Sequence, residues 1–292
     1  MRLIDGGLST QLAIRGAQID DPLWTGRALL DHPALVEQAH RDFVDAGATA
    51  IITASYQISR IGFVHSGLSA DDADRALTHS VEVARRAVAH TTTKVAASVG
   101  PYGAISHDGA EYRGNYGVTR ELLSEFHRER LEVLVAAAPD VLAIETIPDL
   151  VEASVLSELL EQYPHIPKWF SFTCADEQHL WAGSTIEEAV TAIAATPGLT
   201  AVGVNCVDPG LVAGLARRIR SVVDVDVIAY PNRGGTWDAE TGAWAGARAD
   251  SFATWLPAWS AAGVTIVGGC CGTDASDIAE LRRALDIEHP SV

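Results

Sequence analysis

The chain has 292 residues, of which 48% are hydrophobic and 20% are charged, a composition typical of a globular protein with a large core. Its formal charge of −17 argues against nucleic acid or an anionic membrane surface as a partner, because both attract basic proteins. No run of about 18 uncharged apolar residues suggests a membrane span, and the chain leads into a predicted strand without a signal peptide, so we expect a cytoplasmic protein.

Eight short apolar runs recur along the chain. They are rich in Val, Ile, Ala and Phe and do not alternate with polar residues, which is the pattern of parallel strands buried on both faces. The runs cover residues 3–8, 48–55, 94–101, 141–147, 168–174, 201–207, 226–232 and 264–271.

Helical patterns separate these runs. The first begins at Pro33 and stops at Gly47, and the others cover residues 70–90, 119–138, 149–163, 185–196, 209–223, 248–262 and 275–285. Eight strands alternating with eight helices predict an α/β protein whose residues 1–292 form one (β/α)8 TIM barrel domain. An open doubly wound sheet is the alternative, but no G-x-G-x-x-G turn follows the first strand.

The longest predicted loop, residues 102–118, follows the third strand and contains Glu111-Tyr112-Arg113-Gly114-Asn115-Tyr116-Gly117. In a barrel this loop lies on the C-terminal face, and its length favours a binding element or lid.

Polar and sulfur-bearing residues gather where the predicted strands end, which in β/α barrels is where the active site forms. These residues are Asp5, Thr53, Ser55, Glu145, Thr146, Asn205, Cys206, Cys270 and Cys271.

Three cysteines carry the strongest chemical signal. Cys206 ends the sixth strand and Cys270-Cys271 ends the eighth, and inward side chains of strands with the same parity share one layer of a barrel. Neighbouring residues of a regular strand point to opposite sides, but the glycines that flank the Cys-Cys pair permit a departure from strand geometry. Three thiolates suit zinc with a fourth position left for substrate, so we expect Zn²⁺ at the C-terminal face of the strands.

All four cysteines are expected to be thiols, because the chain is large and has no secretion signal. Cys174 also ends a strand, and we interpret it as a buried core residue. A strained Cys270–Cys271 disulfide is a minor alternative, and a zinc-binding or redox protein with structural cysteines is another. Zinc deprotonates a coordinated thiol, and three protein thiolates weaken its Lewis acidity, so the site favours thiol alkylation over hydrolysis.

Six motifs together resemble the homocysteine S-methyltransferase family, in order and over residues 2–286. They are Asp5-Gly6-Gly7-Leu8-Ser9-Thr10-Gln11-Leu12, Thr53-Ala54-Ser55-Tyr56-Gln57, Ser98-Val99-Gly100-Pro101-Tyr102-Gly103, Glu145-Thr146-Ile147-Pro148, Gly203-Val204-Asn205-Cys206 and Gly268-Gly269-Cys270-Cys271-Gly272. The resemblance implies a zinc enzyme that methylates the thiol of homocysteine to give methionine. It is nearest to members that use the sulfonium donor S-methylmethionine, with S-adenosylmethionine as a further donor.

The resemblance also implies roles for single residues. Cys206, Cys270 and Cys271 would hold zinc, and with Glu145 they are the candidate catalytic residues. Glu145 and Asp5 would bind the homocysteine ammonium.

Other strand-end residues complete the implied substrate site. Thr53 and Ser55 would lie on the carboxylate side of homocysteine, and Asn205 belongs to the same site. Trp24 offers a ring face for the cationic methyl donor, because cation–π attraction favours sulfonium and quaternary ammonium groups. Betaine remains the alternative donor, and the oligomeric state stays open.

Overall fold

Eight parallel strands form a barrel in the computed structural model, which describes residues 1–18, 21, 23–106, 108–234, 236–238, 243–245 and 251–288. The sheet order is β1-β10-β7-β6-β5-β4-β3-β2, and a parallel bridge between Ile4 and Ala50 joins its two ends. The strands are β1 (Arg2–Leu3), β2 (Ala50–Ile52), β3 (Lys94–Val99), β4 (Val141–Ile147), β5 (Lys168–Phe172), β6 (Leu199–Asn205), β7 (Asp226–Tyr230) and β10 (Ile266–Val267). The predicted (β/α)8 barrel is confirmed, and the open doubly wound sheet is excluded.

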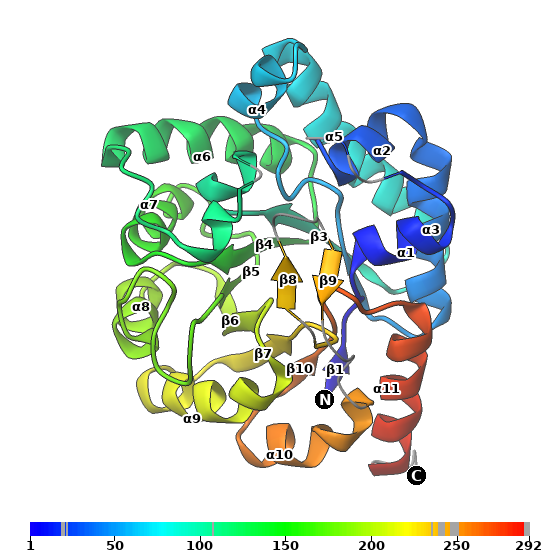
Figure 1. Ribbon diagram of the computed structural model, residues 1–292, viewed down its shortest axis with the longest axis vertical. Helices are drawn as coiled ribbons and strands as arrows, with labels where there is room; N and C mark the ends of the chain where they lie inside the picture. The colour runs from blue at the N-terminus through cyan, green and yellow to red at the C-terminus, as the bar shows by residue number, and fades with distance from the viewer. Residues whose placement is uncertain are drawn as a thin grey trace.

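Helices surround the strands, as Figure 1 shows. They are α1 (Leu8–Ile14), α2 (Thr25–Asp31), α3 (Pro33–Asp45), α4 (Arg60–His65), α5 (Ala70–Ala87), α6 (Arg120–Ala136), α7 (Leu150–Leu160), α8 (Ile186–Ile193), α9 (Val212–Val222), α10 (Leu256–Ala261) and α11 (Ala275–Glu288). Short 3-10 helices are η1 (Tyr102–Ile105), η2 (Ala110–Tyr112), η3 (Pro209–Leu211) and η4 (Phe252–Thr254).

The boundaries differ from the prediction mainly at the first and last barrel strands. Both are two residues long, because the glycine-rich segments that follow them leave the strand ladder to surround the mouth of the barrel. Helices α1, α2 and α4 and the antiparallel pair β8 (Thr236–Asp238) and β9 (Ala243–Ala245) were not expected. The helix predicted over 248–262 divides into η4 and α10, and residues 248–250 lie outside the described part of the chain.

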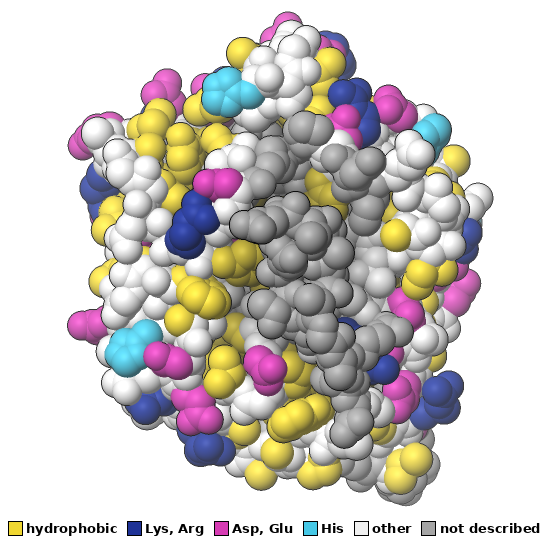
Figure 2. Space-filling view, in the orientation of Figure 1, with side chains coloured by type: hydrophobic (Ala, Val, Ile, Leu, Met, Phe, Trp, Pro, Cys, Tyr) yellow, Lys and Arg dark blue, Asp and Glu magenta, His cyan; other side chains and the backbone are white. Residues whose placement is uncertain are grey.

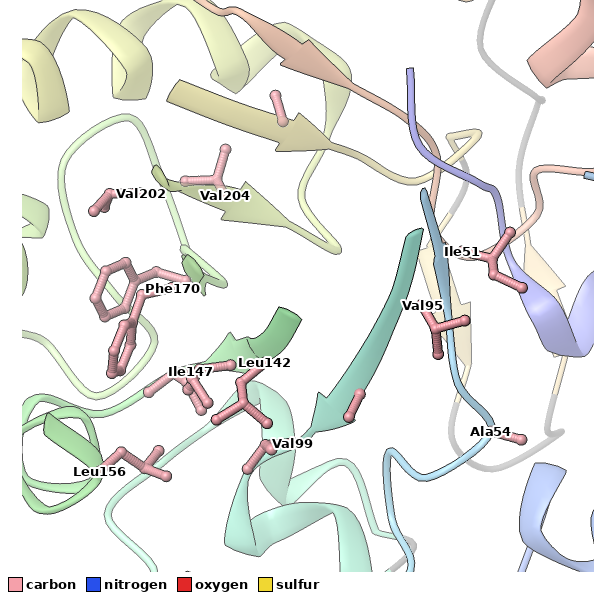
Figure 3. Packing of buried hydrophobic residues seen from close by; sticks show 14 of the residues in the cluster. Ile51, Ala54, Val95, Val99, Leu142, Ile147, Leu156, Phe170, Val202 and Val204 are labelled. Atoms are coloured by element: carbon pink, nitrogen blue, oxygen red, sulfur yellow. The ribbon is translucent and has the colours of Figure 1, made fainter. Parts of the chain in front are cut away.

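Two apolar layers hold the barrel together. Outward-facing strand residues such as Val95, Leu142 and Phe170 pack in the layer between the strands and the helices (Figure 3). A second layer fills the barrel itself, with small side chains opposite the large ring of Trp169. Its members are Ile4, Ala50, Ala96, Ala143, Trp169, Ala201, Ile228, Tyr230 and Ile266. This inner layer forms an apolar floor below the strand ends, on which a polar site can be built.

The surface agrees with the acidic composition. On the face shown in Figure 2, Lys and Arg side chains are dispersed among Asp and Glu side chains. Within the described residues, no helix combines the length and the apolar character that crossing a bilayer requires.

Strands β6 and β7 approach so closely that Gly203 has no room for a side chain. An added Cβ would lie 1.6 Å from the Ile228 carbonyl oxygen, which cannot move without shifting the β7 backbone. We therefore expect Gly203→Ala to lower the free energy of unfolding by about 1–3 kcal/mol or more, measured by denaturant titration. Gly214→Ala in α9 is the control, because its Cβ would meet only the flexible Glu177 side chain, at 3.3 Å. Equal stability of the two variants would contradict this account of the β6–β7 contact.

Candidate active site

A pocket of about 100 Å³ opens at the carboxyl ends of the strands, where the polar residues were expected. Side chains and backbone from the loops after most barrel strands line it, together with residues from the long loop after β3. The lining residues are Asp5, Gly6, Gly7, Leu8, Ser9, Trp24, Thr25, Ile52, Thr53, Ala54, Tyr56, Glu111, Tyr112, Glu145, Thr146, Asn205, Cys206, Tyr230, Gly269, Cys270 and Cys271.

The three strand-end cysteines meet in this pocket, with their Sγ atoms all within 4.8 Å of one another. Cys206 and Cys270 are joined as a disulfide, with Cα atoms 5.7 Å apart, whereas Cys271 is a free thiol. The expectation of four thiols is therefore wrong for this pair. The alternative of a vicinal Cys270–Cys271 disulfide is also wrong, because those sulfurs lie 4.0 Å apart.

Both consecutive cysteines reach the pocket because the strand has already ended at Val267. The Cys270 N–H donates to the Pro231 carbonyl at 2.8 Å, which ties the turn to the end of β7. Position 7 packs against this turn and must be glycine, because a Cβ there would lie 2.4 Å from the Cys270 carbonyl oxygen. Gly272 follows with φ +76°, a left-handed conformation that glycine adopts without strain.

The thiol cluster fits a thiophilic divalent cation. Sulfurs that share a tetrahedral zinc with Zn–S bonds of about 2.3 Å lie roughly 3.8 Å apart, close to the Cys270–Cys271 separation of 4.0 Å. Burial raises the pKa of the Cys271 thiol to about 12, so a nearby cation is required to keep a thiolate there at neutral pH. Among the described residues the cluster contains no fourth Cys, His, Asp or Glu, which leaves a coordination position for a ligand.

Cys174 lies outside this cluster. It is 3% exposed, belongs to the outer apolar layer and does not line the pocket. Its placement agrees with the interpretation as a buried core residue.

Glu145, near the end of β4, presents its carboxylate to the pocket from a buried position. Ser98 donates a hydrogen bond to Oε1, and the Tyr230 hydroxyl donates to Oε2 at 3.1 Å. Burial raises the pKa of Glu145 to about 7, although both hydrogen bonds favour the charged form. The carboxylate is thus rigidly held and ionises near neutral pH.

Asp5 supplies a second buried carboxylate just after β1. Oδ2 accepts a hydrogen bond from the Ile52 N–H at 2.7 Å, while Oδ1 is buried without a hydrogen-bond partner in the described part of the chain. Burial, reinforced by the charge of Glu145, raises the pKa of Asp5 well above its usual value. Two neighbouring buried carboxylates are both stable as anions only when a cation lies between or beside them.

Of the two predicted hydroxyl residues after β2, Thr53 lines the pocket and Ser55 does not. Thr53 lines it, whereas Ser55 lies behind the wall and donates to the Ser98 carbonyl at 2.7 Å. Since that bond uses the Ser55 proton, Thr53 donates to Ser55 at 2.7 Å and accepts from the Ser98 N–H at 3.1 Å. The Thr53 hydroxyl therefore has no proton left for a ligand, and Ser55 is placed to support Thr53.

Asn205 fastens β4 to β6. Its Oδ1 accepts from the Thr146 N–H at 2.8 Å, and its Nδ2 donates to the Thr146 hydroxyl at 2.7 Å. The register of β4 shifts between Ile144 and Ile147, so both Glu145 and Thr146 face the pocket. Thr146 has φ 59°, a strained conformation for a β-branched residue that these two hydrogen bonds stabilise.

One wall of the pocket is aromatic. The ring of Trp24 meets the ring of Tyr56 edge to face, with centroids 6.2 Å apart. Tyr112 lies beside Cys271, and a hydrogen bond between them favours the thiolate. Glu111 borders the same wall.

Several site residues were given no individual role from the sequence. Tyr56, Ser98, Ser171, Tyr230, Glu111 and Tyr112 lie in or directly behind the wall. Ser98, Ser171 and Tyr230 could have been found as polar residues inside otherwise apolar strands. Glu111 and Tyr112 come from the long loop that was expected to be a binding element or lid, and both line the pocket.

Comparisons with known proteins show the family to which this chain belongs. A family model described as homocysteine S-methyltransferase matches residues 2–285. Homocysteine S-methyltransferase 2 of Zea mays is 40% identical over 304 residues, covering 97% of this chain and 89% of the relative. Homocysteine S-methyltransferase of Escherichia coli strain K12 is 39% identical, covering 96% and 94%. The metallated crystal structure of the E. coli homocysteine methyltransferase MmuM is 37% identical and covers 97% and 96%, with a TM-score of 0.87. The chain therefore belongs to the homocysteine S-methyltransferase family of enzymes.

Proposed function

We propose that this enzyme transfers a methyl group from S-methylmethionine to the thiol of L-homocysteine and releases methionine. The observation that carries the proposal is the presence of three cysteine sulfurs and two buried carboxylates in one pocket. A thiophilic metal site next to an ammonium-binding site matches a substrate that has a thiol at one end and an ammonium at the other.

Reduced Cys206, Cys270 and Cys271 would hold Zn²⁺. When bound, the ion would keep the homocysteine sulfur as a thiolate at neutral pH, where a free thiol of pKa about 8.5 is mostly protonated. Tyr112 supports the same charge state, because its hydrogen bond stabilises the thiolate form of Cys271. An external thiol reductant would first have to supply the two electrons that cleave the disulfide, since Cys206 and Cys270 cannot be bonded to each other and bind as two thiolates.

Glu145 and Asp5 would bind the homocysteine ammonium. The cation would neutralise two carboxylates that burial otherwise pushes toward their protonated forms. The substrate carboxylate would lie beside Thr53 and be received by the main-chain N–H of Ala54, because the Thr53 hydroxyl already donates to Ser55 and the Thr53 N–H to the Ala96 carbonyl. Asn205 would act indirectly, by holding Thr146 and the end of β4 in place.

The transfer is a displacement at carbon. The homocysteine sulfur forms a bond to the donor methyl, the donor S–CH₃ bond breaks, and its electron pair remains on the donor sulfur. A sulfonium then leaves as a neutral thioether, which is a better leaving group than the tertiary amine that betaine would release. The ring face of Trp24 would attract the cationic donor.

The metal assignment predicts about one zinc per reduced chain. Cys206→Ser, Cys270→Ser and Cys271→Ser should each lose most of it, because each removes one of three sulfur ligands. Metal analysis of the purified, reduced proteins is the measurement, and Cys174→Ser, which alters a cysteine outside the pocket, is the matched control. Full zinc in Cys206→Ser, or loss of zinc in Cys174→Ser alone, would refute the assignment.

Glu145→Gln should weaken homocysteine binding roughly ten- to a hundredfold, the loss expected for a hydrogen bond to a charged group. Because the pKa of Glu145 is raised to about 7, the fraction of binding-competent carboxylate falls as the pH is lowered through 7. L-Methionine has the same amino-acid head and no thiol, so its affinity should be higher at pH 8 than at pH 6.

Calorimetry with methionine at both pH values separates this effect from thiol chemistry. Most of the pH dependence should disappear in Glu145→Gln, with zinc content unchanged. An unaltered affinity in a folded, zinc-loaded variant would rule out the proposed role of Glu145.

The donor assignment predicts a higher kcat/KM for S-methylmethionine than for betaine. S-Adenosylmethionine should be weaker than S-methylmethionine, because the site would also have to admit a nucleoside. Side-by-side kinetics with the three donors test this order, with homocysteine and enzyme held constant. A clear preference for betaine would overturn the donor assignment and leave the metal–thiol chemistry standing.

A further inference from the structure

Glu111 brings a third carboxylate to the pocket, and the proposed function has not used it. The residue lies in η2, within the long loop between β3 and α6. Its Oε2 is buried and has no hydrogen-bond partner among the residues that the structure describes, which is costly for a carboxylate. Burial raises the pKa of Glu111 for the same reason.

The charge of Arg113 lowers the pKa of Glu111, but burial together with the charge of Asp108 outweighs it. Arg113 forms an ion pair with Asp108 at 2.6 Å and donates to the Asp108 carbonyl at 2.6 Å, so its guanidinium is engaged at the surface. On the pocket side, the charge of Glu111 acts on Tyr56, Tyr112 and Cys271 and contributes to the raised pKa of each. An unpaired buried carboxylate beside aromatic rings is complementary to an organic cation.

The loop holds Glu111 in a defined position. Buried Glu152 of α7 accepts from the Tyr102 N–H at 2.5 Å and from the Tyr116 hydroxyl at 3.0 Å, so it ties down both halves of the loop. His127 of α6 contacts the same carboxylate at 2.8 Å. Gly103 completes the fit, because a Cβ there would lie 2.6 Å from the Glu111 backbone nitrogen.

Glu111 and Glu145 reach the pocket from different elements, and the charges of both act on Tyr56 and Cys271. Glu145 is held by Ser98 and Tyr230 at the mouth of the barrel and is coupled to Asp5, whereas Glu111 approaches from the loop and borders Tyr56 and Tyr112. Homocysteine has one ammonium, which the first group already accommodates. A second zwitterionic substrate brings a further cation, and Glu111 remains available for it.

We propose that Glu111 binds the α-ammonium group of an amino-acid methyl donor, which makes it a determinant of donor specificity. This inference rests on the proposed function. The ammonium keeps its charge throughout the reaction, whereas the sulfonium loses its charge as the methyl group leaves. A carboxylate directed at the sulfonium would stabilise the ground state more than the transition state and slow the transfer, so the ammonium is the partner consistent with efficient catalysis.

The test compares two sulfonium donors. S-Methylmethionine has an α-ammonium, and dimethylsulfoniopropionate has a sulfonium and a carboxylate but no ammonium. Glu111→Gln should lower kcat/KM for S-methylmethionine roughly ten- to a hundredfold, chiefly through KM, and change the value for dimethylsulfoniopropionate by less than about threefold. KM for homocysteine and zinc content should stay unchanged, and Glu125→Gln, on the exposed face of α6, is the matched control.

Equal losses with both donors, or no loss with either, would overturn the role of Glu111. Calorimetric binding of S-methylmethionine to wild type and Glu111→Gln gives a readout independent of turnover, and equal affinities would also overturn it. If the proposed function itself is wrong, the kinetic result differs from these outcomes. Wild type would then transfer no methyl group to homocysteine from any donor, whatever residue occupies position 111.

Discussion

The pair of hydrogen bonds between Asn205 and Thr146 determines the geometry at the mouth of the barrel. It joins β4 to β6 at the point where β4 shifts its register and Thr146 takes a strained backbone conformation. Regular strand geometry would turn one of Glu145 and Thr146 away from the barrel interior, and the shift lets both face it. The next residue after Asn205 is Cys206, which also has a positive φ of 51° and turns its sulfur toward Cys270. One side-chain amide thus positions the carboxylate side and the sulfur side of the pocket together.

The pocket combines groups that are unfavourable when buried alone. Asp5, Glu145 and Glu111 are carboxylates withdrawn from water, and Cys271 is a half-buried thiol whose pKa is raised. Each of these groups becomes favourable when a cation is bound beside it. The arrangement therefore indicates the charge of the ligands: a metal cation would bind the sulfurs, and organic ammonium groups would bind the carboxylates. Such pre-formed negative sites around an apolar floor favour a small zwitterion over a neutral molecule.

The sulfurs of Cys206 and Cys270 form the disulfide, and the same two sulfurs are proposed as metal ligands. Gly7, Gly272 and the Pro231 carbonyl bring the Cys270 turn close to the end of β6, and this proximity allows either a covalent bond or a shared ligand. Cys271 remains a free thiol in the disulfide-bonded arrangement, because its sulfur lies 4.0 Å from that of Cys270.

Local patterns in the sequence were sufficient for the barrel and for most strand-end residues. Strand β4 was predicted with its observed bounds, because a buried parallel strand has a continuous apolar run that can be recognised without its neighbours. Strands β1 and β10 are shorter than predicted, since their final residues belong to turns that only the closed barrel requires. Asp5, Thr53, Glu145, Asn205 and the three cysteines do line the pocket, because polar residues at the ends of parallel strands converge once the barrel closes.

Tertiary structure alone decided what each of these residues can do. Ser55 lies behind the wall because its hydroxyl bonds a carbonyl of the neighbouring strand, 43 residues away in sequence. Glu111 enters the pocket because Glu152, from a later helix, anchors its loop. By itself the sequence determined which residues are buried and where polar groups interrupt the apolar runs, since burial and period are local properties. Hydrogen bonds between distant strands and loops then decided which atoms remain free to meet a ligand, and no local pattern encodes those contacts.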